Sequence, residues 1–492
     1  MFIPFGQWAP DSPALDGKAR VAKNCIGESN YYRSFPALGA VSDALDGRAF
    51  GAISFMDGAG TTFNFAGDAT KLYKLASNAW SNVSKSGNYT TLTDGRWEFA
   101  KFGSKVIATN YLNDVQYFDT SSSSLFADLA GSPPRAKHIA VVNNFVVLAN
   151  LVDATFGTAN NSLRWSGIND PEDWTAAAST QSDGQLLEEG DGGAIQGIVG
   201  NSNYGIIVQE RAIQRMNYVG SPLVFTFEVL ERNRGTPIPN SVVGVGREVF
   251  YISDDGFYRF NGVQSIPIGK DRVSKWFWDN FDNTYSERIS ATIDPLNTIV
   301  MWAFTTNGAA SGGNPNRIIT YNWIADKFTL IELDLEVIFQ ALTSGLTLEE
   351  LDNISASIDA LPFSLDSSAY TGGKLLAGVI DTDHKLGYFT GDAMTATIET
   401  SEVEGAKNKM TEIQQVTPMI EGDGDTATTV KMGKRNNRTD AVSYGSSISL
   451  DSFGRAMTRS NGRYHQIETT ISGGFEKATG VEVDRITQGG ER

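Results

Sequence analysis

The amino-acid sequence predicts an all-β protein built around a β-propeller. Short runs of alternating apolar and polar residues recur about every forty positions, which is the period of propeller blades. Each run contains a tight polar turn and closes on Tyr or Phe. The 492 residues include 50 glycines and 11% aromatics, a composition that suits many turns and strands. Because one such unit cannot bury its own faces, the units are expected to pack around a common axis.

Two segments show the repeat most clearly, 99–119 and 242–262. The second contains Asp254-Asp255-Gly256, a hairpin turn that needs a positive φ. The pair Asn143-Asn144 predicts another hairpin turn between two apolar runs. The repeats extend over 49–391, and we expect them to form a propeller of about six to eight blades.

The two ends of the chain differ from the repeats. Residues 1–48 are interrupted by Pro and Asp, which predicts an irregular N-terminal docking arm. Trp8, Tyr31 and Tyr32 have no blade to bury them there, so they are candidate residues for docking onto an adaptor. Residues 392–492 contain long polar-alternating strands, which favour a C-terminal β-sandwich-like domain. A short helix is predicted within 347–362.

The charge balance limits the partners of the protein. The formal net charge is -17 and the pI is about 4.7, which argues against a protein that grips nucleic acid through its phosphates. Acidic side chains concentrate in the segment 178–193. Glu188, Glu189 and Asp191 are candidates for a channel-lining loop that would repel phosphate and let DNA slide. The alternative is a solvated surface loop.

The sequence contains no recognisable catalytic constellation, metal site or cofactor motif. Cys25 is the only cysteine, so a disulfide within the chain is excluded. The three histidines, His138, His384 and His465, are far apart and are expected to be hydrogen-bonded structural residues. The acidic stretch 170–174 is expected to be a structural turn with a packed Trp174, and 421–425 a solvated hairpin tip. We therefore expect no enzyme, no catalytic residue, no cofactor and no metal.

Targeting signals are also lacking in the sequence. The first residues do not show a basic stretch followed by an apolar one, as a signal peptide would. No run of about 18 apolar residues occurs, so no membrane-spanning segment is expected. These observations favour a protein made and folded in a reducing cytoplasm.

Several segments together carry a family resemblance. They are W-x-P-D-x-P-x-L at Trp8–Leu15, RWSGINDPEDW at Arg164–Trp174, DDGFYRFNG at Asp254–Gly262 and GRYHQI from Gly462. In this order they resemble the tail nozzle or hub proteins of short-tailed bacteriophages, also called packaged-DNA stabilisation proteins. The likeness is diffuse and runs nearly from end to end.

The resemblance implies a structural virion protein. Such proteins contain a β-propeller and form a ring, typically a homo-hexamer, below the portal and the head-to-tail adaptor. The ring extends and gates the channel for double-stranded DNA, retains packaged DNA and anchors tail fibres or spikes. By this resemblance the protein would be made in the host bacterial cytoplasm and reside in the phage tail.

Two other functions fit a propeller. The first is a glycan-binding or glycan-degrading propeller, similar to a depolymerase, which needs an arginine cluster or a carboxylate pair on the axis. Four arginines lie close together in the sequence, Arg211, Arg215, Arg232 and Arg234, without a matching acid and nucleophile. The second is a monomeric propeller that only recruits protein partners.

Overall fold

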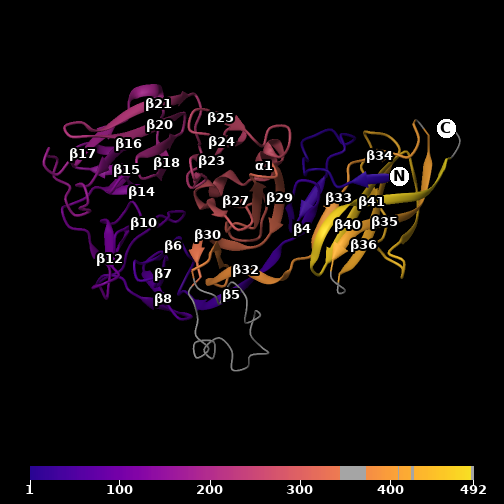
Figure 1. The fold of residues 1–492 in the computed structure, drawn as a ribbon, viewed down its shortest axis with the longest axis horizontal. Helices are drawn as coiled ribbons and strands as arrows, with labels where there is room; N and C mark the ends of the chain where they lie inside the picture. The colour runs from indigo at the N-terminus through magenta and orange to yellow at the C-terminus, as the bar shows by residue number, and fades with distance from the viewer. Residues whose placement is uncertain (344–372, 408, 423–425, 489–492) are drawn as a thin grey trace.

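The protein consists of a β-propeller and a β-sandwich that lie beside each other (Figure 1). The computed structural model describes residues 1–343, 373–407, 409–422 and 426–488. Strands make up 55% of the structure and helices 3%, which confirms the all-β prediction. The predicted helix within 347–362 and part of the predicted hairpin tip 421–425 lie outside the described residues. None of the described helices is long and apolar enough to cross a membrane.

The propeller is a ring of four-stranded antiparallel units. Among the described residues, six units are separate sheets, and a seventh forms the first four strands of an 11-stranded sheet. The first four units are β6 (Gly51–Met56), β7 (Thr62–Gly67), β8 (Leu72–Ala76) and β9 (Ala79–Asn82); β10 (Glu98–Phe102), β11 (Lys105–Thr109), β12 (Gln116–Asp119) and β13 (Ala127–Asp128); β14 (Arg135–Val142), β15 (Phe145–Asp153), β16 (Gly157–Trp165) and β17 (Asp183–Leu186); β18 (Ile195–Gly200), β19 (Tyr204–Gln209), β20 (Ala212–Gly220) and β21 (Val224–Arg232). The other three are β22 (Val243–Val245), β23 (Glu248–Ser253), β24 (Gly256–Phe260) and β25 (Ser265–Pro267); β26 (Ser290–Asp294), β27 (Ile299–Phe304), β28 (Arg317–Asn322) and β29 (Lys327–Glu332); β30 (Leu335–Leu342), β31 (Leu375–Asp381), β32 (Lys385–Ala393) and β5 (Pro36–Ala44).

The predicted hairpin turns are confirmed. Asn143 and Asn144 form the two-residue loop between β14 and β15 with φ of 43° and 58°. Two consecutive positive φ values define the turn whose twist matches the flanking strands. Gly256 has φ 128° at the start of β24, so the Asp-Asp-Gly turn also needs its glycine.

The ring closes through the N-terminal part of the chain. Strand β5 precedes the first blade in sequence, yet it pairs with β32 as the fourth strand of the last blade. This pairing covers the outer edge of β32, whose free backbone groups would otherwise face solvent. Closure therefore joins residues 36–44 to residues 385–393 and locks the first and last blades together.

The sandwich is formed by two sheets that include N-terminal strands. One sheet contains β3 (Cys25–Gly27), β4 (Tyr32–Ser34), β41 (Phe475–Gln488), β35 (Thr411–Gly422) and β39 (Ala456–Gly462), with β1 (Phe2–Pro4) beside β41. The other contains β2 (Val21–Lys23), β33 (Ala396–Glu399), β40 (Tyr464–Ser472), β36 (Ala427–Arg435), β37 (Ser443–Tyr444), β34 (Val403–Glu404) and β38 (Ile448–Ser449). Both chain ends lie at this side of the molecule (Figure 1). The short helices are α1 (Ser274–Asn280), η1 (Glu189–Asp191) and η2 (Asn283–Arg288).

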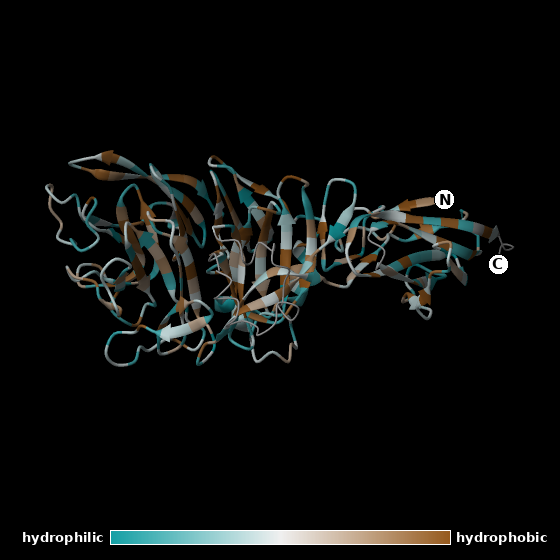
Figure 2. Ribbon diagram, turned by 60° about the horizontal axis from the view of Figure 1, so that its bottom comes forward, coloured by the Kyte–Doolittle hydropathy of each residue, from teal (hydrophilic) through white to brown (hydrophobic). Residues whose placement is uncertain are grey.

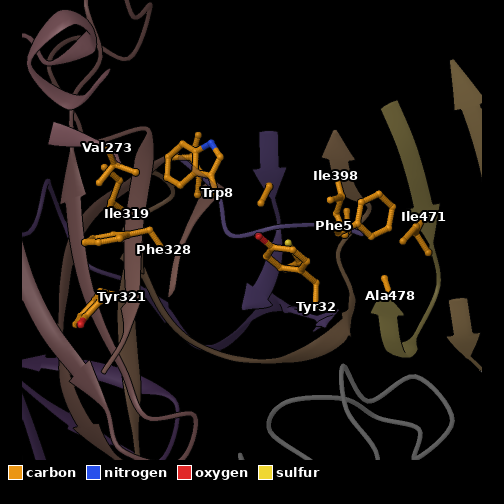
Figure 3. Packing of buried hydrophobic residues seen from close by; sticks show 14 of the residues in the cluster. Phe5, Trp8, Tyr32, Val273, Ile319, Tyr321, Phe328, Ile398, Ile471 and Ala478 are labelled. Carbon is orange, nitrogen blue, oxygen red and sulfur yellow. The ribbon is translucent and has the colours of Figure 1, made fainter. Parts of the chain in front are cut away.

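Strand β2 connects the two units without a linker. It pairs in parallel with β29 of the propeller through Lys23 and Leu330, and antiparallel with β33 of the sandwich. The 11-stranded sheet therefore runs from a blade into the sandwich. Hydrophobic segments follow the strands of both units (Figure 2). One buried cluster spans the junction, from Phe328 and Val273 on the propeller side to Ile398 and Ile471 in the sandwich (Figure 3).

Residues 1–48 do not form a separate docking arm. Trp8 is 3% exposed and packs edge to face on Trp276 of α1, with ring centroids 5.2 Å apart. Tyr32 is fully buried and donates a hydrogen bond to the backbone oxygen of Gly6 at 2.7 Å. The expectation that these two aromatics are exposed is wrong because the sandwich and α1, not a blade, bury them. Tyr31 stays half-buried.

The boundary between the units lies after the last propeller strand. Strand β32 ends at Ala393 and β33 begins at Ala396, beside the predicted division at 391–392. The sandwich buries an acidic side chain, Glu399, which is 4% exposed and accepts a hydrogen bond from Tyr444. Burial raises the pKa of Glu399 to about 7, although the Tyr444 hydrogen bond opposes the shift.

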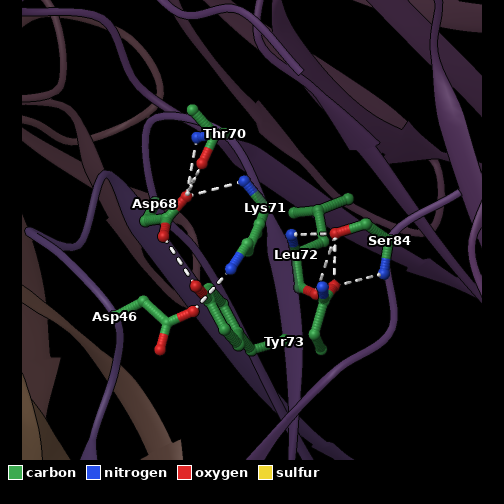
Figure 4. A network of polar contacts seen from close by, with 8 residues as sticks. Asp46, Asp68, Thr70, Lys71, Leu72, Tyr73 and Ser84 are labelled. Carbon is green, nitrogen blue, oxygen red and sulfur yellow. Dashed lines mark hydrogen bonds and ion pairs between the residues drawn. The ribbon is translucent and has the colours of Figure 1, made fainter. Parts of the chain in front are cut away.

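A buried aspartate organises the turn between β7 and β8 in the first blade (Figure 4). Asp68 is 5% exposed and accepts hydrogen bonds from the backbone N–H groups of Thr70 and Lys71, both at 2.6 Å. The hydroxyl of Tyr73 donates to its second oxygen at 2.7 Å. Asp46 pairs with the side chain of Lys71 at the exposed edge of this network at 2.6 Å. With the hydroxyl of Thr70, which donates at 3.3 Å, one carboxylate with four donors fixes the turn.

Candidate functional site on the propeller axis

The first strand of each blade surrounds the propeller axis. Strand β6 packs against β10 and β30, β10 against β14, β14 against β18, and β26 against β22 and β30. Small residues allow this close approach: a Cβ built on Gly200 would lie 2.0 Å from the backbone oxygen of Val141 in the neighbouring blade. The axis is therefore a narrow, side-chain-lined space.

Two adjoining cavities occupy this space. A cavity of about 210 Å³ is lined by first-strand residues of several blades, including Ala52, Glu98, His138, Gln196 and Ala291. A larger cavity of about 440 Å³ lies beside it and reaches the surface at Leu92 and Thr93, which are exposed. Because the cavities are this small, a DNA duplex cannot pass through one propeller.

Charged side chains from separate blades form ion pairs around the cavities. Nδ1 of His138 lies 2.8 Å from Oε1 of Glu98. Nζ of Lys137 lies 2.9 Å from Glu287, and Nε of Arg288 lies 2.5 Å from Oδ1 of Asp94.

A further pair lies beside them. Nδ1 of His384 lies 2.7 Å from Oε1 of Glu336, whose other oxygen accepts the N–H of Ala49 at 2.7 Å. The first, second, third, sixth and seventh blades, or the segments leading into them, contribute to these pairs. The network therefore links several blades around the axis.

The environment shifts the ionisation of this network. Burial raises the pKa of Glu98, but the charge and hydrogen bond of His138 and the charge of Arg96 outweigh it, so the net shift is downward. Burial lowers the pKa of the Arg96 guanidinium. Burial, aided by the nearby charge of Arg288, also lowers the pKa of Arg48 to about 10. Such shifts concentrate where charges are held in low-dielectric clefts, a pattern common to functional sites.

The sequence-predicted acidic loop lies elsewhere. Glu189 and Asp191 are in η1, next to β21 at the outer side of the fourth blade. Gln214 donates to the backbone oxygen of Glu189 at 3.1 Å, and Glu188 is exposed. None of Glu188, Glu189 and Asp191 lines the two axial cavities. Whether they face a channel between copies of the chain stays a prediction.

The other sequence-predicted residues have structural surroundings. Trp174 is 3% exposed and its indole N–H donates to Pro171, so the predicted turn with a packed Trp is confirmed. His138, His384 and His465 are all hydrogen-bonded, as expected.

The four clustered arginines do not line the axial cavities. Arg215 pairs with Glu228 at 2.6 Å, and Arg234 with Asp255 at 2.9 Å. The described residues contain no group of three or more His, Cys, Asp or Glu arranged to hold a metal ion.

Sequence reasoning missed the axial residues. Arg48, Arg96, Glu98, Lys137 and Glu287 belong to no motif. What they share is their position, because each lies just before or near the beginning of the first strand of a blade. Charged residues at that point of successive repeats would have indicated an axial cluster.

Comparisons with known proteins identify no family. No family model matches the chain, and no curated protein matches it. Among solved structures, the computationally designed protein Ika8 aligns with 78% of this chain and 100% of its own, at 10% identity and a TM-score of 0.38. The extracellular domain of a B. thetaiotaomicron protein assigned to the one-component systems aligns with 85% of this chain at 13% identity and a TM-score of 0.39. This chain spans 46% of that second chain.

Proposed function

We propose that this protein is a structural virion protein, a subunit of the ring-shaped tail nozzle or hub of a short-tailed phage. In this role it would lie below the portal and adaptor, extend and gate the DNA channel, retain packaged DNA and anchor fibres or spikes. The specific role comes from the sequence resemblance. The observation in the structure that supports it most is the unbroken connection between propeller and sandwich.

The connection is one of backbone hydrogen bonds and buried side chains. Strand β2 bridges β29 and β33, and the N-terminal segment caps α1 through Asp11, which accepts the N–H groups of Lys275 and Trp276 at 2.8 Å. Domains joined only by linkers move relative to each other by default. A shared sheet and core instead fix the two units in one orientation. A channel wall that must resist the pressure of packaged DNA needs subunits whose two units keep a fixed orientation.

The DNA path in this proposal runs between copies of the chain. The axis of one propeller holds the Glu98–His138 and Lys137–Glu287 pairs and leaves only the cavities of about 210 Å³ and about 440 Å³. A channel wide enough for a duplex would therefore need a ring of several chains. The net charge of -17 suits a lumen that does not hold phosphates, since phosphate binding needs clustered Lys and Arg.

Removal of the chain from the virus tests the proposal. Particles assembled without it are expected to lose packaged DNA and to lack the tail tip, and supplying the full chain in trans restores both. Particles that keep their DNA and infect normally without the chain would contradict the proposal.

The alternative is a propeller that binds or degrades glycans. The observation in its favour is the surface-open cavity of about 440 Å³, which falls in the range of about 300–1,000 Å³ typical of small-molecule sites. Incubation of the purified chain with host surface polysaccharide separates the two. A fall in polysaccharide chain length would favour the alternative, and an unchanged chain length would exclude glycan degradation by this chain.

A further inference from the structure

Two guanidinium groups beside the axis donate to backbone oxygens and not to carboxylates. Arg96 donates from Nη1 to the backbone oxygen of Ile289 at 3.2 Å, and Arg48 from Nη2 to that of Thr93 at 3.0 Å. Among the described residues, neither forms an ion pair, in contrast to Arg288 and Lys137 beside them. The charge of Glu98 acts on Arg96 without such a contact. Guanidinium N–H groups that no carboxylate occupies are suited to an anion.

Arg96 lies at the centre of the axial space. It lines the cavities of about 440 Å³ and about 210 Å³, and it also lines a pocket of about 10 Å³ together with Arg48, which lines neither larger cavity. An anion would therefore reach Arg96 through the surface-open cavity. Guanidinium groups suit carboxylates and phosphates because their planar fork donates two parallel hydrogen bonds.

The charged side chains that line these three spaces favour a ligand with a single negative charge. The basic side chains that line the three spaces are Arg48, Arg96, Lys137 and Arg288, and the acidic ones are Asp94, Glu98, Glu287 and Glu336. The positive and negative formal charges of these side chains therefore balance, so the carboxylates would repel a second negative charge on a ligand. A carboxylate is better suited to this wall than a dianionic phosphate.

Unpartnered polar atoms next to Arg96 suit ligand hydroxyls. Nε2 of His138 and Oε1 of Gln196 are buried without a hydrogen-bond partner, and both side chains line the cavity of about 210 Å³. The residues are 1% and 8% exposed. A hydroxyl can both donate and accept, so it would satisfy the imidazole nitrogen and the amide oxygen alike.

We propose that the axial cavities bind a small hydroxylated monocarboxylate, of which an acidic monosaccharide is the size match. Arg96 would hold the carboxylate, and His138 and Gln196 would form hydrogen bonds with the hydroxyls. The inference does not depend on the proposed ring, because the site lies within one chain.

Calorimetric titration of the full chain with glucuronate, glucose and inorganic phosphate tests the site. Glucuronate is expected to bind, and glucose and phosphate to bind at least about tenfold more weakly, since each lacks one matched feature. Arg96→Gln is expected to weaken glucuronate binding by about tenfold or more. Arg211→Gln is the matched control, because Arg211 is largely exposed, lies off the axis and should leave binding unchanged.

Three results would overturn the proposal. They are equal binding of glucose and glucuronate, tighter binding of phosphate, or no binding of glucuronate up to about 10 mM. Unchanged affinity in Arg96→Gln would also overturn it. If that variant does not fold, as near-ultraviolet circular dichroism would show, Gln196→Leu takes its place, and weaker binding of glucuronate is again expected.

Discussion

Replacing Trp8 by Ala tests whether the N-terminal segment is a structural part of the protein. The indole is 3% exposed, packs on Trp276 with centroids 5.2 Å apart and donates from Nε1 to the backbone oxygen of Arg20 at 3.2 Å. An aromatic side chain of this kind buries about 150–250 Å², worth about 4–6 kcal/mol at ~25 cal/mol per Å². Truncations of buried aromatics to Ala cost about 3–5 kcal/mol in practice. We therefore expect Trp8→Ala to lower the free energy of unfolding by about 3–5 kcal/mol.

The matched control is Tyr31→Ala, an aromatic truncation in the same segment. Tyr31 is half-buried and makes no side-chain hydrogen bond among the described residues, so the expected loss is below about 1 kcal/mol. Urea unfolding followed by far-ultraviolet circular dichroism gives both values. Equal losses in the two variants, or a loss below about 1 kcal/mol for Trp8→Ala, would refute the structural role.

Three further predictions concern stability. Asp68→Ala should cost about 2–4 kcal/mol because four donors lose their acceptor, whereas Asp46→Ala, at an exposed ion pair, should cost less than about 1 kcal/mol in the same urea assay. Equal costs would contradict the network in Figure 4. Glu399 is protonated in the native state and ionised in the unfolded state between its ordinary pKa of 4.5 and its native pKa of about 7. The free energy of unfolding therefore falls as pH rises through that window, by about 3 kcal/mol over the whole window. Glu399→Gln should remove this fall, and an unchanged pH slope between pH 5 and 8 would show that another group causes it. Gly200→Ala should destabilise the propeller, because its Cβ would lie 2.0 Å from a neighbouring backbone oxygen, while Gly58→Ala, with open space around it, should not; comparable melting temperatures would disprove the close blade contact.

The propeller could be predicted from the sequence because its signals are local. Alternation of apolar residues and turn chemistry such as Asn143-Asn144 depend on neighbours in sequence. The structure confirms both. The same locality explains why Trp174 could be placed in a packed turn.

The role of the N-terminal segment could not be predicted because its partners are distant in sequence. Strand β5 pairs with residues 385–393, and Trp8 packs on Trp276. Neither pairing leaves a periodic signal in the short N-terminal strands. The axial site was missed for a related reason: Glu98 meets His138 only when neighbouring blades pack together, and each residue alone has no motif.

The most direct test of the proposed function is electron cryomicroscopy of the chain within the virus particles that contain it, reconstructed without imposed symmetry. The account predicts a ring of equivalent subunits below the portal and adaptor, with a lumen wide enough for a duplex between the subunits and none through the propeller axes. A single propeller on a spike or fibre, in place of a ring below the portal, would contradict the nozzle and favour glycan binding.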